Sequence, residues 1–281
     1  MTTVAITGAT GYLGGQVARQ LDDAGLSPRL VVRDPTSPRM PHLPGVRDVR
    51  GAGYGEHAAA VTALRGVDLL FMVSASESAD RLTQHRSFVA AAAEAGVRHV
   101  VYTSFQGAAP DATFTLARDH WATEQAIRDS GMAYTFLRDS FYLDFLPHLA
   151  DESGVIRGPA GDGRVAAVAR ADVVRVAAQV LCDPGAHHNV AYDLTGREAL
   201  TLDEAAQIIS QSTGRHVTYV RESVEQAHRS RARLQAPAWQ VEAWVSTYLA
   251  IAAGEVAAVS TAVHDITGRE PLTLKQVLAA R

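Results

Sequence analysis

The chain opens with a short apolar segment that runs directly into a glycine-rich turn. Val4-Ala5-Ile6 is followed by Thr7-Gly8-Ala9-Thr10-Gly11-Tyr12-Leu13-Gly14, after which a helical pattern continues to about residue 24. A strand that passes through three such glycines into a helix is typical of dinucleotide-binding proteins. The first glycine permits the sharp turn, the second leaves room for a pyrophosphate, and the third lets the helix pack closely on the strand. We therefore expect this segment to bind a nucleotide phosphate, which the helix dipole also favours.

The first half of the chain continues as alternating strand and helix patterns. Further strands are predicted at residues 29–32, 46–50, 68–73, 98–103 and 134–137. Helices are predicted between them, at residues 11–24, 56–64, 78–95 and 116–130. Nearly continuous apolar strands separated by helices are typical of a parallel sheet covered on both faces. The sequence therefore predicts an α/β fold, a doubly wound parallel sheet of the Rossmann type, with its ligand beyond the carboxyl ends of the strands.

The second half of the chain is less regular. We expect a glycine-rich loop over residues 154–163, helices at 172–181 and 202–213, and a strand at 190–194. The ten-residue segment that begins at Asp193 has a similar sequence to the one that begins at Asp265. Each segment places a threonine, Thr201 or Thr273, before a predicted helix. A threonine there predicts a helix N-cap. We assign residues 1–150 to an NAD(P)-binding domain and residues 151–281 to a smaller mixed α/β region, interleaved with the first.

Composition narrows the class of protein. The formal net charge of −4 argues against a nucleic-acid-binding protein, and 47% hydrophobic residues suffice for a substantial core. Cys182 is the only cysteine, which excludes an internal disulfide and fits a reducing compartment. We find no signal peptide, no membrane-spanning stretch and no metal-ligand spacing. We expect a cytoplasmic protein that binds no membrane, nucleic acid or metal; the sequence does not indicate its oligomeric state.

The residue after the second predicted strand bears on the choice of coenzyme. An NAD site usually has an acidic residue there, which accepts hydrogen bonds from the ribose hydroxyls. In this chain the strand ends in Arg33, followed by Asp34, and Arg39 lies nearby. A guanidinium suits a 2′-phosphate, so NADPH is the favoured coenzyme. The alternative is that Arg33 is a solvated loop residue and Asp34 binds the ribose of NADH.

Together with further motifs, the chain resembles the NmrA-like group of atypical short-chain dehydrogenases. Within that group it is most similar to the branch of type 2 NADPH:quinone reductases and triphenylmethane reductases. The likeness runs from residue 3 to about residue 278. The motifs that carry it are Gly8 to Gly14, Val32-Arg33, Tyr102-Thr103-Ser104-Phe105, Phe114 to His120, Leu137-Arg138 with Phe141-Tyr142, and Asp193-Leu194-Thr195-Gly196.

The resemblance implies where NADPH and the substrate bind. Arg33 would meet the 2′-phosphate, and the segment Val73-Ser74-Ala75 would pass the adenosine ribose and the pyrophosphate. Thr103, Ser104 and Phe105 would lie near the nicotinamide, where Ser104 orients the carboxamide or caps a loop. Phe141 and Tyr142 would flank the coenzyme and, with Phe105, form an aromatic wall for the substrate. The C-terminal region would cover the cleft.

The chain also departs from the family pattern. The Gly-Asp-Tyr segment expected after the third strand is represented by Gly53-Tyr54, without the acidic residue. The Arg-Pro-Gly segment expected after the sixth strand reads Arg138-Asp139-Ser140, and a later asparagine is Asp144. Two carboxylates near the expected nicotinamide pocket favour either an altered choice of substrate or weaker binding of an anionic coenzyme.

Typical short-chain dehydrogenases use a tyrosine and a lysine one helical turn apart to move the carbonyl proton. The corresponding positions are Leu116 and His120, so alcohol–ketone chemistry with a dedicated tyrosine acid is not expected. His120 is the best-placed titratable candidate for catalysis. The alternative is that its ring only hydrogen-bonds the ribose or a backbone carbonyl. Tyr142 is a second candidate donor, with the aromatic wall as its alternative role.

Two functions remain open from the sequence. The first is an NADPH-dependent oxidoreductase that transfers hydride to a small electrophile, most plausibly a quinone or a related conjugated compound. The second is a sensor of the NADP+/NADPH ratio that binds a protein partner, which the missing Tyr/Lys pair favours. A fold alone does not separate these two functions.

Overall fold

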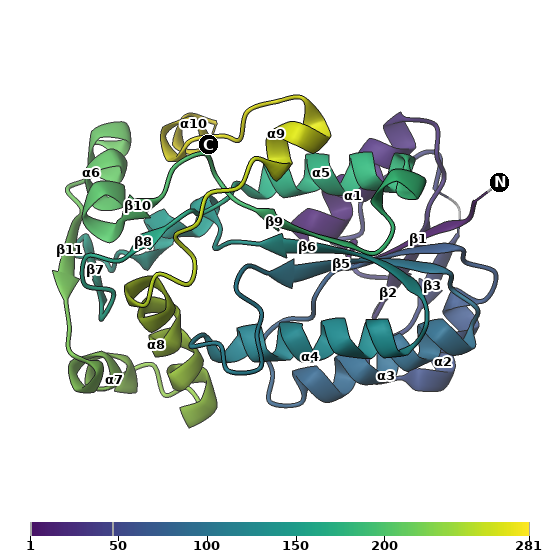
Figure 1. The fold of residues 1–281 in the computed structure, drawn as a ribbon, viewed down its shortest axis with the longest axis horizontal. Helices are drawn as coiled ribbons and strands as arrows, with labels where there is room; N and C mark the ends of the chain where they lie inside the picture. The colour runs from purple at the N-terminus through teal and green to yellow at the C-terminus, as the bar shows by residue number, and fades with distance from the viewer. Residues whose placement is uncertain (1, 47, 281) are drawn as a thin grey trace. The chain divides into compact units, whose positions relative to one another are not determined.

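The computed structural model describes residues 2–46 and 48–280, which contain a seven-stranded sheet in the order β3-β2-β1-β4-β5-β6-β9 (Figure 1). The pairs β1–β2, β1–β4, β2–β3 and β4–β5 are parallel. The strands are β1 (Val4–Thr7), β2 (Arg29–Val32), β3 (Val49–Gly51), β4 (Leu69–Met72), β5 (His99–Phe105), β6 (Ala133–Asp139) and β9 (Val190–Leu194). This order confirms the predicted doubly wound fold, because the chain runs outward from β1 in both directions.

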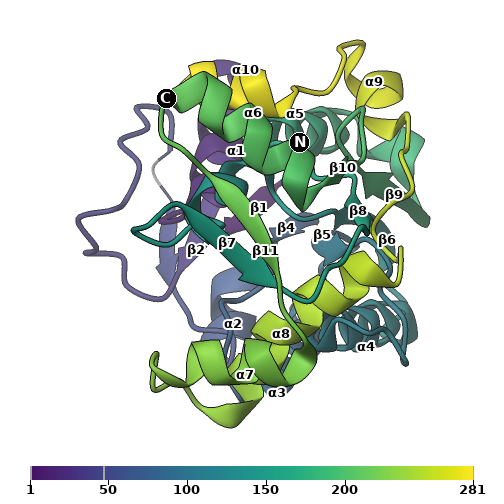
Figure 2. The same cartoon turned by 90° about the vertical axis from the view of Figure 1, so that its left-hand side faces the viewer.

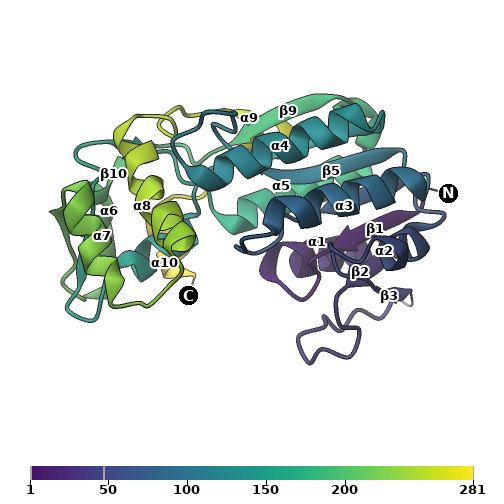
Figure 3. The same ribbon diagram turned by 90° about the horizontal axis from the view of Figure 1, so that it is seen from below.

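Helices cover both faces of this sheet. The two on one face are α1 (Tyr12–Asp23) and α5 (Arg170–Cys182), and those on the other are α2 (His57–Leu64), α3 (Arg81–Glu94) and α4 (Thr115–Asp129) (Figures 1 and 3). The central strands β1 and β4 are buried along their whole length, as their unbroken apolar sequences predict. The predicted strand at residues 46–50 is observed only from Val49, and residue 47 lies outside the described residues.

The chain divides into two compact units, and neither unit is one continuous stretch. Unit 1 comprises residues 1–104, 119–137 and 173–192, and unit 2 comprises residues 105–118, 138–172 and 193–281. The chain passes from one unit to the other near the last residues of β5, β6 and β9. Each unit has its own hydrophobic core. Phe88, Tyr102 and Phe136 lie in that of unit 1, and Phe105 and Ile156 in that of unit 2.

Unit 2 contains two short two-stranded sheets. Strand β7 (Val155–Gly158) pairs in parallel with β11 (Thr218–Arg221), and β8 (Arg164–Val165) pairs antiparallel with β10 (Leu200–Thr201). The helical segments are η1 (Leu143–Leu149), α6 (Leu202–Thr213), α7 (Val224–Ala232), α8 (Ala238–Ala252), α9 (Ala262–Thr267) and α10 (Leu274–Ala279); a further short 3₁₀ turn, η2 (Pro184–His187), belongs to unit 1. Figure 2 shows β7 beside β11, with α6 on one side of the pair and α7 and α8 on the other.

The prediction of a loop over residues 154–163 was wrong for its first half, which forms β7. The glycines there reflect close packing rather than an open loop. A Cβ at Gly158 would lie 2.2 Å from Cδ1 of Tyr248, and one at Gly163 would lie 2.2 Å from the carbonyl oxygen of Ile251. Glycine in a strand often marks such a close approach. Because a high glycine content is also typical of loops, composition alone did not indicate this strand.

The two similar segments that begin at Asp193 and Asp265 each contain a helix N-cap, as predicted. Thr201 accepts a hydrogen bond from the N–H of Glu204, whose carboxylate accepts one from the N–H of Thr201. Thr273 and Gln276 form the same reciprocal pair before α10. Both are capping boxes, which satisfy two backbone donors at a helix start. Within the described ranges, no helix combines the length and hydropathy needed to cross a lipid bilayer.

Candidate functional site

A cavity of about 500 Å³ lies in unit 1, beyond the carboxyl ends of β1, β2 and β4. This is the edge of a parallel sheet where nucleotides bind. The residues that line it come from the end of β2, from the segments that follow β1, β2, β3 and β4, and from α3: Gly8, Thr10, Gly11, Val31, Val32, Arg33, Asp34, Ser37, Arg39, Ala52, Gly53, Tyr54, Val73, Ser74, Ala75, Ser76 and Gln84.

The glycine-rich turn forms one wall of this cavity. Gly8 has a φ of +65°, a conformation that side chains rarely adopt, and its carbonyl accepts a hydrogen bond from the N–H of Gly11. No side chain of the described residues caps the start of α1, so its first N–H groups remain available to an anion. Of the predicted segment, Gly8, Thr10 and Gly11 line the cavity, whereas Ala9, Tyr12, Leu13 and Gly14 do not.

Arg33 and Asp34 both line the cavity, but their side chains differ in availability. Asp34 Oδ1 accepts hydrogen bonds from the backbone N–H of Thr36 at 2.9 Å and from its hydroxyl at 2.6 Å. These bonds lower the pKa of the Asp34 carboxyl and tie it into a local turn. Arg33 is exposed and makes no hydrogen bond or ion pair with any residue that the structure describes. At the end of β2, the guanidinium of Arg33 is therefore fully available to a ligand, whereas only Oδ2 of the Asp34 carboxylate is.

The segment after β4 forms another part of the cavity wall, and its backbone N–H groups are bonded to side chains of the protein. The N–H of Val73 donates to Thr7 Oγ1, that of Ser74 to Thr103 Oγ1, and that of Ala75 to His85 Nε2, at 2.7–2.9 Å. Thr103, predicted to contact the coenzyme, is buried beneath this loop and supports it. Ser104 is also buried, and its hydroxyl donates to Glu124 Oε1 at 2.6 Å.

His120 lies in a buried polar network behind the same loop. The guanidinium of Arg81, itself only 3% exposed, donates from Nε to the carbonyl of Ala75 and lies 3.0 Å from His120 Nε2. The hydroxyl of Tyr102 lies 3.0 Å from the other ring nitrogen, Nδ1. Because Arg81 can only donate, Nε2 accepts and Nδ1 carries the proton. Burial, with Arg81 close by, holds the pKa of His120 well below its usual value, so the ring is neutral.

The observed partners of the His120 ring are the side chains of Arg81 and Tyr102, not the ribose or the backbone carbonyl of the alternative role, and its catalytic role stays a prediction. Both ring nitrogens have protein partners, and the neutral ring lacks the second, acidic proton that an imidazolium would donate near neutral pH. Arg81 connects the ring of His120 to the loop after β4. Its Nη1 also lies 3.3 Å from Oδ2 of Asp119. His120 is thus arranged to fix Arg81, and through it the wall of the cavity.

Three residues that build this site were not among the site residues predicted from the sequence. Tyr54 lines the cavity, bonds Thr7 Oγ1 at 2.6 Å and donates to the carbonyl of Val73, so it joins β1 to the loop after β4. His85 accepts the N–H of Ala75, and burial lowers its pKa to about 3. The third is Arg81. An arginine and a histidine four residues apart near a helix start are the only sequence signal for this support.

The predicted aromatic wall lies in unit 2. The rings of Phe105, Phe114 and Phe141 form a cluster with centroids 4.9–5.4 Å apart. The hydroxyl of Tyr142 donates to Asp139 Oδ2 at 2.7 Å, so this phenol has a carboxyl partner. Burial raises the pKa of Asp139 to about 8, opposed in part by the bond from Tyr142.

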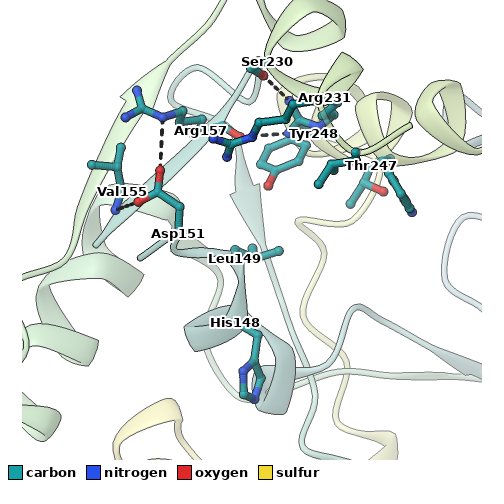
Figure 4. A pocket seen from close by; sticks show the side chains of 12 residues that line it. His148, Leu149, Asp151, Val155, Arg157, Ser230, Arg231, Thr247 and Tyr248 are labelled. Atoms are coloured by element: carbon teal, nitrogen blue, oxygen red, sulfur yellow. Dashed lines mark hydrogen bonds and ion pairs between the residues drawn. The ribbon is translucent and has the colours of Figure 1, made fainter. Parts of the chain in front are cut away.

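Unit 2 also contains a separate cavity of about 390 Å³, between the end of η1, β7, α7 and α8 (Figure 4). Its arginines are largely engaged. Arg231 donates to the carbonyl of Arg157 and lies over the ring of Tyr248, and Arg157 pairs with Asp151 at 3.5 Å. None of the residues predicted for coenzyme or substrate lines this cavity.

Comparison with known proteins places the chain among its relatives. Residues 1–239 match the NmrA-like family. The chain belongs to this family. It is 39% identical over 223 residues to quinone oxidoreductase 2 of Escherichia coli, an alignment that covers 77% of this chain and 76% of that protein.

Two solved structures agree with this assignment. The NADPH-dependent quinone oxidoreductase of Escherichia coli in complex with NADPH has a TM-score of 0.90 and 33% identity, with 99% of each chain covered. The triphenylmethane reductase of a Citrobacter species has a TM-score of 0.86 and 33% identity, with 99% of this chain and 98% of that chain covered. These matches confirm the branch of the NmrA-like family that the sequence motifs predict.

Proposed function

We propose that this protein is an NADPH-dependent oxidoreductase that transfers hydride to a small conjugated electrophile, with quinones and dye-like compounds as the substrate class. The relatives support the reaction: one is named a quinone oxidoreductase, one a triphenylmethane reductase, and one was solved with NADPH bound. The cavity beyond β1, β2 and β4 supports the coenzyme. The cytoplasmic location expected from the single cysteine belongs to the same proposal.

The observation that carries the choice of coenzyme is the contrast between Arg33 and Asp34. A carboxylate that binds both ribose hydroxyls offers both of its oxygens, whereas Oδ1 of Asp34 is already bonded twice to Thr36 and only Oδ2 is left. The Arg33 guanidinium lines the same cavity without a partner among the described residues. A free guanidinium there forms strong charge-assisted bonds with a 2′-phosphate, which NADPH has and NADH lacks.

Each wall of the cavity has a part in holding the coenzyme. The turn at Gly8 and Gly11 and the uncapped start of α1 would bind the pyrophosphate. The backbone of Val73 to Ala75, fixed by Thr7, Thr103 and His85, would pass the ribose. When bound, NADPH supplies the hydride for the reduction. The chain then has to orient the acceptor and provide any proton the product needs.

The test of the reaction is NADPH oxidation by the purified protein with a panel of quinones, enones and triphenylmethane dyes. We expect turnover above the background rate with at least one quinone or dye. Tight NADPH binding with no turnover on the panel would remove the reductase proposal. It would leave the NADP(H) sensor as the remaining function.

Replacement of Arg33 by alanine is expected to weaken NADPH binding about 10- to 100-fold and to leave NADH binding almost unchanged. The reason is that only NADPH carries the phosphate that the guanidinium meets. Calorimetric titration of both coenzymes measures the effect. Arg65→Ala, an exposed arginine outside the cavity, is the matched control. Equal weakening of both coenzymes would contradict the assignment of Arg33 to the 2′-phosphate.

Replacement of His120 by alanine is expected to raise the NADPH KM about 10-fold and to change kcat less than about threefold. Loss of a proton donor would instead lower kcat by about 100-fold or more. His120 bonds Arg81, which holds the carbonyl of Ala75, so its loss loosens the wall of the cavity. Steady-state kinetics distinguish the two outcomes. A large fall in kcat at unchanged KM would restore His120 as the catalytic acid.

A further inference from the structure

The cavity of unit 2 has a volume of about 390 Å³, within the range of small-molecule binding sites. Its walls come from the end of η1, from β7, from the last turn of α7 with the two residues after it, and from α8 (Figure 4). All these segments belong to unit 2. The described walls of this cavity therefore lie within one compact unit.

One part of the cavity wall is aromatic and apolar. Tyr248 of α8 is buried, and the guanidinium of Arg231 lies over its ring at 5.0 Å from the centroid. Trp244, one helical turn earlier on α8, lines the same cavity and is half-buried. Leu149 and Leu234 also line the cavity, and both are exposed. Such a wall favours a flat apolar ligand, which buries much area against aromatic rings and leucines.

The charged side chains of the cavity include more arginines than carboxylates. Among the described residues that line it, Arg157, Arg231 and Arg233 accompany a single carboxylate, that of Asp151. Oδ1 of Asp151 accepts the N–H of Val155 at 3.1 Å, and Oδ2 lies 3.5 Å from Nε of Arg157 (Figure 4). The one acidic group is thus already bonded within the wall and balances Arg157.

The other two arginines differ in their availability. Nη1 of Arg231 lies 3.2 Å from Oε2 of Glu222, and Nη2 donates to the carbonyl of Arg157 at 2.9 Å. Arg233 follows α7 directly and is exposed, and it forms no hydrogen bond or ion pair with any residue in the described part of the chain. Arg233 is therefore the arginine of this cavity whose charge a ligand can meet.

The two parts of the cavity together define the ligand. An ion pair with an exposed guanidinium is weak in water and is screened by salt, so a small inorganic anion gains little here. An uncharged apolar ligand gains contact with the aromatic wall but leaves the guanidinium unused. A flat apolar body that ends in a carboxylate uses both, because a guanidinium forms paired, charge-assisted bonds with a carboxylate.

We propose that this cavity is a binding site for a small aromatic carboxylate. Its rings lie against Tyr248 and Trp244, and its carboxylate meets the guanidinium of Arg233. The ligand is neither the coenzyme nor the hydride acceptor, so the site stands independently of the reductase function.

The probe for this site is 2-naphthoate, and the matched neutral ligand is 2-naphthamide, which has the same rings without the charge. Both are titrated calorimetrically into the full chain with saturating NADP+ present, which occupies the coenzyme cavity of unit 1. We expect 2-naphthoate to bind with a Kd below about 1 mM and about fivefold more tightly than the amide.

Three variants test the two parts of the wall. Arg233→Gln is expected to weaken 2-naphthoate binding about fivefold and to change amide binding less than about twofold. Arg229→Gln removes an exposed arginine of α7 that does not line the cavity and is expected to change neither. Leu234→Ala is expected to weaken both ligands about threefold, because it removes apolar contact area. Leu234 is 56% exposed, so its truncation leaves the core intact.

The indole N–H signals of the tryptophans locate the bound probe. The chain has three tryptophans, of which Trp244 lines the cavity and Trp121 and Trp239 do not. In 1H–15N spectra, the Trp244 signal is assigned by its absence in Trp244→Phe. We expect 2-naphthoate to shift this signal more than the other two.

Several outcomes would overturn the proposal. These are no binding of 2-naphthoate at about 1 mM, binding that leaves the Trp244 signal unshifted, or equal losses in Arg233→Gln and Arg229→Gln. A dimer that binds no 2-naphthoate and that dissociates in Leu234→Ala, measured by sedimentation, would assign the cavity to a contact between two copies of the chain. The experiment measures no turnover, so a failure of the reductase function would leave its result unchanged.

Discussion

Replacement of Gly14 by alanine is expected to lower the free energy of unfolding by about 3 kcal/mol and the Tm by roughly 6–12 °C. A Cβ on Gly14 would lie 2.5 Å from the carbonyl oxygens of both Thr7 and Gly8. These are backbone atoms of β1 and its turn, so no side-chain movement relieves the clash. Helix α1 must move away from the strand, and the phosphate-binding turn moves with it. We therefore also expect NADPH to bind at least about 10-fold more weakly.

Thermal unfolding and calorimetric titration of Gly14→Ala measure these two effects. Gly25→Ala, at the other end of α1, is the matched control. Gly25 has a φ of +77°, and a Cβ there would meet nothing within 4 Å. It should cost only the local backbone strain of roughly 1 kcal/mol and leave NADPH binding unchanged. A Gly14→Ala protein with wild-type Tm and affinity would show that α1 does not need to pack this closely.

The sheet of unit 1 could be predicted because its strands are buried on both faces. Segments such as Leu69–Met72 are apolar at every position, and helices with glycine at their ends separate them. The pairing β7–β11 in unit 2 could not be predicted in this way. Its strands are four residues long, carry arginines and glycine, and lie about 60 residues apart in the chain. Only long-range contacts reveal that they pair.

The parts of the candidate site that a local sequence motif defines could be predicted. The parts that depend on tertiary contacts could not. The turn at Gly8 and Gly11 follows from three glycines in eight residues. The choice between Arg33 and Asp34 depends on Thr36, two residues after the aspartate. An aspartate followed two residues later by threonine is a known turn pattern, and it would have favoured Arg33 as the free group.

The side chains that hold the loop after β4 do so through contacts between α3, α4 and β5. His85 of α3 reaches Ala75 and Thr123, and Tyr102 of β5 reaches His120 of α4. A histidine in a helix is compatible with many roles. Its burial and its two hydrogen-bond partners decide which role it has, and both depend on how α3 and α4 pack on the sheet.

Asp139 is expected to make the fold less stable as pH rises, in a range where most carboxyl groups are already ionised. An aspartate in an unfolded chain has a pKa of about 3.9. Burial raises the pKa of Asp139 in the folded protein to about 8. The folded state thus keeps a proton that the unfolded state has released. The stability that this group contributes is complete below pH of about 4 and is lost progressively as pH rises toward 8, at about 1.4 kcal/mol per pH unit.

Asp139→Asn removes this dependence, because the asparagine amide resembles the neutral acid in size and does not ionise. The difference in unfolding free energy between variant and wild type is therefore expected to rise by about 1.4 kcal/mol per unit between pH of about 5 and 8 and to level off above it. Contributions from the other titrating groups cancel in this difference. Urea unfolding of both proteins at a series of pH values measures it. A difference that stays flat across this range would mean that Asp139 is ionised in the folded protein, and its buried carboxylate would then need a partner that compensates its charge.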